Sequence, residues 1–336
     1  MRSSFSLEEG RLKREIAKRN VKRVLLQLPE GLKPEAEKLV EIIESVGATV
    51  IISADPCYGA CDLALEEARA LKADLIVHYG HTPLIMQNEI PTIYFDAKAR
   101  AKITPVVRKA LSLLKEWDKI GLVTTVQHVH TLERAKKVLL EAGKTVIVGD
   151  AGKAVYPGQV LGCEFSNAKV IADEVEAFLF IGGGRFHAIG VGLSTSKPVI
   201  VADPYIRRAY SIEDDVKEVL MRRFASVNEA KKAKNFGVIV GLKVGQRKLK
   251  KALEIKKKLE DAGKKAFLLA LREITPERLM QFPFFDAYIN TACPRLSLDD
   301  TPRFLKPLLT PRELQVLLGE ISWEKLCKEG WFENVE

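Results

Sequence analysis

Short apolar runs, most of them rich in Val, Ile and Leu, recur along the 336-residue chain in three sets of four. Their residue ranges are 21–28, 48–53, 74–79 and 92–95 in the first set, 120–126, 145–148, 177–181 and 199–202 in the second, and 237–242, 266–271, 287–292 and 307–309 in the third. Strands of parallel sheets that helices cover on both faces read as continuous apolar runs of this kind. Helical patterns separate many of the runs, so the sequence predicts α/β architecture with mostly parallel sheets.

A repeated element supports a division into thirds. In each third an amphipathic helical pattern runs into a glycine, and the second strand of the set follows directly: residues 35–47, 133–143 and 254–263. Glycine is the expected left-handed terminator of a helix. We therefore predict three similar small domains related by duplication, at residues 1–104, 105–206 and 207–336. The alternative is that unrelated α/β units share these features.

Each third also contributes one cysteine that follows an apolar run: Cys61, Cys163 and Cys293. Loops at the carboxyl ends of parallel strands form the ligand crevice of such sheets, so these thiols can converge there from distant parts of the sequence. Thiolates bind iron-sulfur clusters or zinc. The sequence thus favours a soft metal centre, against the alternative of three ordinary buried cysteines. The predicted fold is three four-stranded, mostly parallel sheets flanked by helices and arranged around this central site.

Composition and charge restrict the setting of the protein. Five cysteines, an odd number spread over a long chain, fit a reduced cytoplasmic protein better than a disulfide framework. No apolar stretch is long enough to span a membrane. The net charge of +9 is dispersed, and its densest run, at residues 250–258, has the pattern of an amphipathic helix with a solvated face. We expect a cytoplasmic protein with neither membrane nor direct nucleic-acid contact.

Several residues near strand ends are candidates for binding a cofactor. The glycine loop 182–184 and Arg185 could present backbone N–H groups and a guanidinium to a carboxylate or phosphate, although a plain turn explains the loop equally well. Gln27 lies near the end of the first strand of the first third, Glu30 lies in the turn after it, and Gln246 follows the first strand of the last third. All five histidines also lie near strand ends; taken singly, each is more often a hydrogen-bonded structural residue. The candidate cofactor-binding residues are Gln27, Glu30, Gly183, Gly184, Arg185, His187 and Gln246.

Eight segments, read together, resemble the diphthamide biosynthesis family of archaeal 2-(3-amino-3-carboxypropyl)histidine synthases. They are residues 28–32, 58–62, 78–81, 161–163, 184–187, 203–205, 292–296 and 306–311, in the order of the family. The resemblance implies a 4Fe-4S cluster held by Cys61, Cys163 and Cys293, with the fourth iron open to S-adenosylmethionine. Cys57 has no counterpart in the family motif and receives no ligand role, and Cys327 is interpreted as packing.

The resemblance further implies a transferase. Its members move the 3-amino-3-carboxypropyl group of S-adenosylmethionine, as a radical, to C2 of a histidine in translation elongation factor 2. They work as homodimers with an electron donor and lack the usual radical S-adenosylmethionine signature. That signature is absent here, since no third cysteine follows Cys57 and Cys61 at the required short spacing.

Two alternatives from other classes stay open on the sequence. One is a non-catalytic iron-sulfur subunit that delivers electrons to a partner. The other is a structural zinc protein with a three-cysteine site, although structural zinc usually takes four ligands with at least one closely spaced pair.

Overall fold

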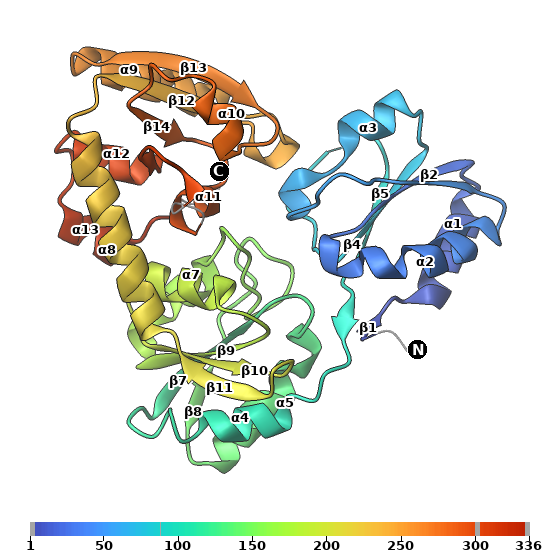
Figure 1. Ribbon diagram of the computed structural model, residues 1–336. Coiled ribbons are helices and arrows are strands. Elements are labelled where there is room, and N and C mark those ends of the chain that lie inside the picture. The colour runs from blue at the N-terminus through green and yellow to red at the C-terminus, as the bar shows by residue number, and fades with distance from the viewer. Residues whose placement is uncertain (1–3, 88, 300–302, 333–336) are drawn as a thin grey trace.

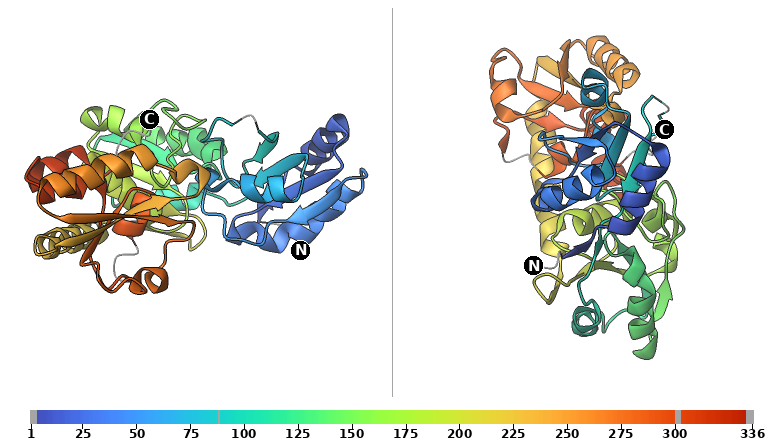
Figure 2. Two further views of the ribbon diagram at one scale, coloured as in Figure 1. Left: turned by 90° about the horizontal axis from the view of Figure 1, so that it is seen from above. Right: turned by 90° about the vertical axis from the view of Figure 1, so that its right-hand side faces the viewer.

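Every apolar run predicted as a strand forms one in the computed structural model, which describes residues 4–87, 89–299 and 303–332. The chain folds into three α/β units around a common centre, with the first unit in blue, the second in green and the third in orange (Figure 1). Seen from above, the second and third units lie over one another and the first extends to the side (Figure 2).

The first unit contains a four-stranded parallel sheet and a two-stranded antiparallel ribbon, β1–β6. Its elements are β1 (Phe5–Ser6), α1 (Glu9–Arg19), β2 (Arg23–Gln27), η1 (Glu30–Glu35), α2 (Ala36–Glu44), β3 (Thr49–Ile52), η2 (Ala60–Asp62), α3 (Leu65–Ala70), β4 (Leu75–Tyr79), β5 (Thr92–Phe95) and β6 (Lys98–Ala99). Apolar clusters cover both faces of the sheet. Leu26 and Val77 pack into one cluster, while their neighbours Leu25 and Ile76 pack into the other. This two-sided burial explains the continuous apolar runs.

The second unit has a five-stranded sheet, one strand more than the sequence predicts. Its elements are α4 (Thr104–Ala110), β7 (Lys119–Thr124), η3 (Val129–Thr131), α5 (Leu132–Glu141), β8 (Thr145–Ile147), α6 (Ser166–Val170), η4 (Ala172–Glu174), β9 (Ala177–Ile181), α7 (Phe186–Thr195), β10 (Val199–Asp203) and β11 (Arg208–Ser211). The additional strand, β11, pairs antiparallel with β10 at the sheet edge. The second sheet therefore continues past residue 206, where the domain limit was expected; the limits themselves stay predictions.

The third unit returns to four parallel strands. It follows the long helix α8 (Glu213–Ala230) and contains β12 (Asn235–Gly241), η5 (Val244–Gln246), α9 (Leu249–Asp261), β13 (Lys265–Leu271), α10 (Pro276–Met280), β14 (Ala287–Asn290), α11 (Pro294–Leu298), β15 (Leu308–Leu309), α12 (Pro311–Leu317) and α13 (Trp323–Glu329). The last helix packs back on the second unit, where Leu326 and Trp331 join the core beneath α7.

The parallel strands have the same order in all three sheets: second, first, third, fourth. The repeated helix ends also agree. Gly47, Gly143 and Gly263 follow α2, α5 and α9 with φ of +90°, +80° and +74°, a conformation that residues with a Cβ rarely adopt. The prediction of three similar, mostly parallel α/β units is confirmed, with the fifth strand of the second sheet as the correction. The shared strand order supports duplication.

Helix α8, which leads from the second unit into the third, is held on the third unit by a buried ion pair. Its residue Arg223 donates from Nε and Nη2 to the two carboxylate oxygens of Glu313 on α12, at 2.7 and 2.6 Å. Both side chains are fully buried. Arg223 also donates to the carbonyl oxygens of Ser297 and Leu308, so one guanidinium ties together four segments of the third unit.

Candidate metal centre

The three predicted cysteines lie at the carboxyl ends of strands, as the parallel topology requires. Cys61 is in η2 after β3, Cys163 is in the loop after β8, and Cys293 precedes α11 after β14. Each is a free, half-buried thiol. We call these three residues the cysteine tripod.

The thiols of the tripod interact electrostatically. Burial raises the pKa of Cys163 to about 12, and the next largest causes are the charges of Cys293 and Cys61. Burial likewise raises the pKa of Cys293 to about 11, followed by the charge of Cys61. These mutual charge effects indicate that the three thiols, which come from three units, lie near one another. Metals bind the thiolate form of cysteine, and burial opposes that form at all three thiols.

A close backbone approach brings the third unit onto Cys61. A Cβ on Gly245, in η5, would lie 2.7 Å from both the Cα and the Cβ of Cys61, so only glycine fits there. The next residue, Gln246, is buried, and its Nε2 lies 3.5 Å from the Cys61 sulfur. Burial raises the pKa of Cys61 and the hydrogen bond from Gln246 opposes that rise. Gln246 thus favours the thiolate.

An ion-pair network that the sequence did not reveal closes the same junction. Lys243 is buried, and its Nζ lies 2.8 Å from the carboxylates of both Asp62 and Glu273. The ammonium also lies 4.2 Å from the centre of the Tyr58 ring. Asp62 follows Cys61 directly, so this network fixes the cysteine loop of the first unit on the third unit. Sequence alone marks lysine as a surface residue, and only the fold shows this pairing.

Arg295, two residues after Cys293, acts on the tripod through its charge, which lowers the pKa of Cys293. Burial lowers the pKa of Arg295, and the charges of Asp299, Cys293 and Cys163 oppose that change. Its Nη2 donates to the carbonyl oxygen of Phe186 at 2.7 Å, and the guanidinium lies 3.8 Å from the centre of the Phe186 ring. Nη1 is buried without a hydrogen-bond partner in the described ranges. Nε and Nη2 of the same guanidinium pair with the Asp299 carboxylate at 2.6 and 2.9 Å.

The candidate residues for cofactor binding are distributed unevenly around this centre. His187 lies close enough to Arg295 and His81 for their charges to act on it, while burial, the main cause, lowers its pKa to about 3. Gln27 is buried and internally bonded: its Nε2 donates to the Asp62 carbonyl oxygen at 2.6 Å, and its Oε1 accepts from the Ala64 N–H. Gln27 thereby holds the segment after Cys61.

The other candidates lie in more open positions. Glu30 is exposed and pairs with Lys33 at 2.9 Å. The Arg185 guanidinium pairs with Asp215 on α8 at 2.5 Å and is mostly exposed. Gly184 is left-handed, with φ of +75°, and its N–H donates to the Asp203 carboxylate, while a Cβ on Gly183 would lie 2.7 Å from the Tyr205 ring. The participation of these residues in cofactor binding stays a prediction.

His128, after β7, provides a pH-dependent prediction that is independent of the metal centre. It is buried, with Nε2 3.0 Å from the Tyr205 hydroxyl, and burial lowers its pKa to about 4. The unfolded chain binds the proton near pH 6.5, so the stability that neutral His128 contributes is present above that pH and is lost as the pH falls toward 4. We expect His128→Gln to reduce the loss of unfolding free energy between about pH 7 and about pH 5 by roughly 1–2 kcal/mol. Urea unfolding of both proteins at both pH values measures this; equal losses would contradict it.

The fold and the site together define a class: a three-unit α/β protein in which each unit contributes one cysteine to a candidate metal centre. A family described as "Putative diphthamide synthesis protein" matches residues 28–327. The chain belongs to this family, as the resemblance predicted.

Individual relatives agree. The chain is 38% identical over 315 residues to 2-(3-amino-3-carboxypropyl)histidine synthase of Pyrococcus horikoshii. The alignment covers 93% of this chain and 90% of that protein. It is 34% identical over 330 residues to the human protein named subunit 1 of that synthase, and this alignment covers 96% of this chain and 74% of the human protein. The crystal structure of Dph2 from Pyrococcus horikoshii with a 4Fe-4S cluster superposes with a TM-score of 0.89 at 36% identity, over 98% of this chain and 94% of that one. In the part of the chain that the structure describes, no helix is long and apolar enough to cross a membrane.

Proposed function

We propose that the protein transfers the 3-amino-3-carboxypropyl group of S-adenosylmethionine to C2 of a histidine in translation elongation factor 2, the first step of diphthamide biosynthesis. The observation that supports the proposal is that each of the three units contributes one cysteine and that the charges of these thiols act on one another. The names of the relatives, which are histidine synthases of this kind, support the same reaction.

The residues at the centre fit a 4Fe-4S cluster. The tripod supplies three thiols to four irons, which leaves one iron for another ligand. The thiols are half-buried rather than sealed, and Gly245 brings the backbone of η5 against Cys61. When bound and reduced, the cluster would supply the electron that breaks the γ-carbon–sulfur bond of S-adenosylmethionine, giving the 3-amino-3-carboxypropyl radical and methylthioadenosine.

The side chains around the tripod have separate tasks in this proposal. The Gln246 amide stabilises negative charge on the Cys61 sulfur, and Arg295 does so for Cys163 and Cys293. The unpartnered Nη1 of Arg295 would bind the carboxylate of S-adenosylmethionine, which selects the carbon that faces the metal. Arg185, whose guanidinium pairs with Asp215, is proposed only as a secondary contact to S-adenosylmethionine from the rim of the centre.

The proposal includes a homodimer in the cytoplasm, where elongation factor 2 and an electron donor are available. Strand β13 is the exposed edge of the third sheet and carries the partly exposed side chains of Phe267 and Leu268. Phe282 and Phe284 extend this apolar surface. Long apolar edge strands are normally covered in solution, and a second copy of the chain would cover this one. Light scattering on wild type and on Leu268→Lys tests the assignment, with a monomeric variant as the expected result.

The decisive experiment uses the purified chain alone. After anaerobic reconstitution with iron and sulfide and reduction, it is incubated with S-adenosylmethionine and elongation factor 2. We expect methylthioadenosine and an elongation factor 2 heavier by one 3-amino-3-carboxypropyl group on its histidine. A brown, reduced protein that releases no methylthioadenosine without a second chain would instead indicate an electron-transfer subunit. A protein that binds zinc but no iron at the tripod would indicate a structural zinc site.

A further inference from the structure

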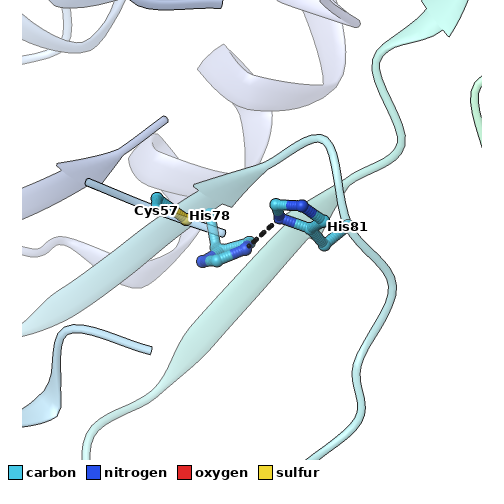
Figure 3. Close-up of side chains that lie close together, drawn as sticks. All are labelled: Cys57, His78 and His81. Carbon is cyan, nitrogen blue, oxygen red and sulfur yellow. Dashed lines mark hydrogen bonds between the residues drawn. The ribbon is translucent and has the colours of Figure 1, made fainter. Parts of the chain in front are cut away.

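Three side chains close to the tripod, but not part of it, form a second group of metal-binding atoms: Cys57, His78 and His81 (Figure 3). His78 is in β4, His81 follows it after a tight turn, and Cys57 precedes η2. Their ligand atoms all lie within 4.8 Å of one another. The nearest pair is Nε2 of His78 and Nδ1 of His81, 2.9 Å apart.

The amide of Gln27 determines which nitrogen of His78 is available. Because the Gln27 Nε2 donates to the Asp62 carbonyl and its Oε1 accepts from the Ala64 N–H, the orientation of the amide is fixed. The Nδ1 of His78, 2.9 Å from Oε1, must therefore carry a proton and donate it. Nε2 is left with a lone pair directed at His81. A histidine that donates from one nitrogen to a carbonyl oxygen while the other nitrogen faces a metal is the usual arrangement around metal ligands.

The spacing suits a tetrahedral ion. With metal–nitrogen bonds of about 2.0–2.1 Å and a metal–sulfur bond of about 2.3 Å, tetrahedral ligands lie roughly 3.3–3.6 Å apart. An ion between these three residues needs the two histidine nitrogens to separate by a few tenths of an ångström and the sulfur to move inward. It also needs the proton of His81 to reside on Nε2 rather than Nδ1.

The electrostatic surroundings favour a cation. Burial lowers the pKa of His78, and it lowers that of His81 to about 4, so both rings are neutral as metal binding requires. Burial raises the pKa of Cys57 to about 12, and the charges of Asp62 and Glu30 raise it further. The field at the sulfur is thus negative, which opposes a bare thiolate but stabilises a divalent cation bound to one.

We propose that Cys57, His78 and His81 form a zinc site, separate from the cysteine tripod, with three protein ligands and one open position. A thiolate with two imidazoles suits zinc, whereas magnesium and calcium require oxygen ligands. The ion ties the segment that leads into Cys61 to the end of β4. Its existence does not depend on the proposed reaction, since it uses none of the residues of the tripod.

Two substitutions separate this site from the tripod. Zinc, iron and sulfide are measured per chain in full-length protein isolated anaerobically and treated with a mild chelator. We expect about one zinc per chain beside the iron. Cys57→Ser should lose the zinc and keep the iron, whereas Cys163→Ser should lose the iron and keep the zinc. Cys327→Ser, a substitution of a thiol on α13 that belongs to neither group, should change neither.

A spectroscopic measurement supports the metal analysis. Added to zinc-stripped Cys163→Ser protein, Co²⁺ should give thiolate-to-cobalt charge-transfer absorption, and the additional substitution Cys57→Ser should remove it. If Cys57→Ser does not fold, His81→Gln replaces it in both measurements, with loss of the zinc as the expected result. Zinc that is absent from folded wild type and not bound on titration would overturn the proposal. So would zinc that persists in Cys57→Ser, or zinc that disappears together with iron in Cys163→Ser.

Discussion

Replacement of Cys163 by serine should abolish both the iron content and the reaction of the reconstituted protein. Cys163 is the thiol that the second unit contributes to the tripod, and the charges of both other tripod residues act on it, so the substitution removes one of the three proposed ligands. Loss of a hydrogen-bonding partner of a metal ligand typically lowers metal affinity or activity about 10–100-fold, and loss of the ligand itself should lower them further. We expect methylthioadenosine formation to fall by more than roughly 100-fold.

Iron and sulfide analysis, visible absorption and a methylthioadenosine assay measure the effect of Cys163→Ser. Cys327→Ser is the matched control, because Cys327 is also a half-buried free thiol but lies on α13, packed beside the core of the second unit. A Cys163→Ser protein that retains full iron and activity would show that the tripod is not the cluster site.

Substitution of Arg223 by methionine should produce the largest loss of stability of any single change outside the metal centre. The substitution leaves the Glu313 carboxylate buried without its bidentate partner and deprives the carbonyl oxygens of Ser297 and Leu308 of a donor. Glu313 retains neutral donors, the Trp331 indole N–H and the Thr310 backbone N–H. Breaking one side of a buried pair costs about 3–5 kcal/mol, and we expect that range here.

The neighbouring arginine provides the control for Arg223→Met. Arg222, on the same helix, pairs with Glu218 at 2.7 Å, and both side chains are substantially exposed. Arg222→Met should cost less than about 1 kcal/mol. The double variant Arg223→Met, Glu313→Gln should recover part of the loss, because it removes the uncompensated charge. Urea unfolding of the wild type and the three variants measures these free energies of unfolding. Equal losses of unfolding free energy in Arg222→Met and Arg223→Met would contradict the assigned role of the Arg223–Glu313 pair.

The strands could be predicted because burial on both faces leaves a continuous apolar run, as in β4 and β9, where every residue is buried. Strand β11 escaped prediction because its sequence, Arg208–Ser211, is mixed and exposed at both ends, as befits an edge strand. Its pairing depends on the chain returning antiparallel beside β10. Such a return is a tertiary feature that local pattern does not show.

The candidate site was predictable only to the level of topology. Strand ends indicate where Cys61, Cys163 and Cys293 gather, but not where a long side chain points. Arg185 follows the glycine loop in sequence, yet its guanidinium pairs with Asp215 on α8, whereas the charge of Arg295 acts on the tripod. The buried partners Lys243 and Asp62 are distant in sequence, and each alone has the character of a surface residue. Their ion pair is what makes the burial of both charged side chains favourable.

The passage of Gly245 against Cys61 has a consequence for biosynthesis. Domains of a nascent chain fold one after another as they leave the ribosome. The first unit can therefore be folded before η5, which packs against Cys61, has been synthesised. Cys293 is synthesised later still. If the tripod holds the proposed cluster, loading can be completed only after the third unit has been synthesised, and a partial opening between the first and third units would expose the cluster.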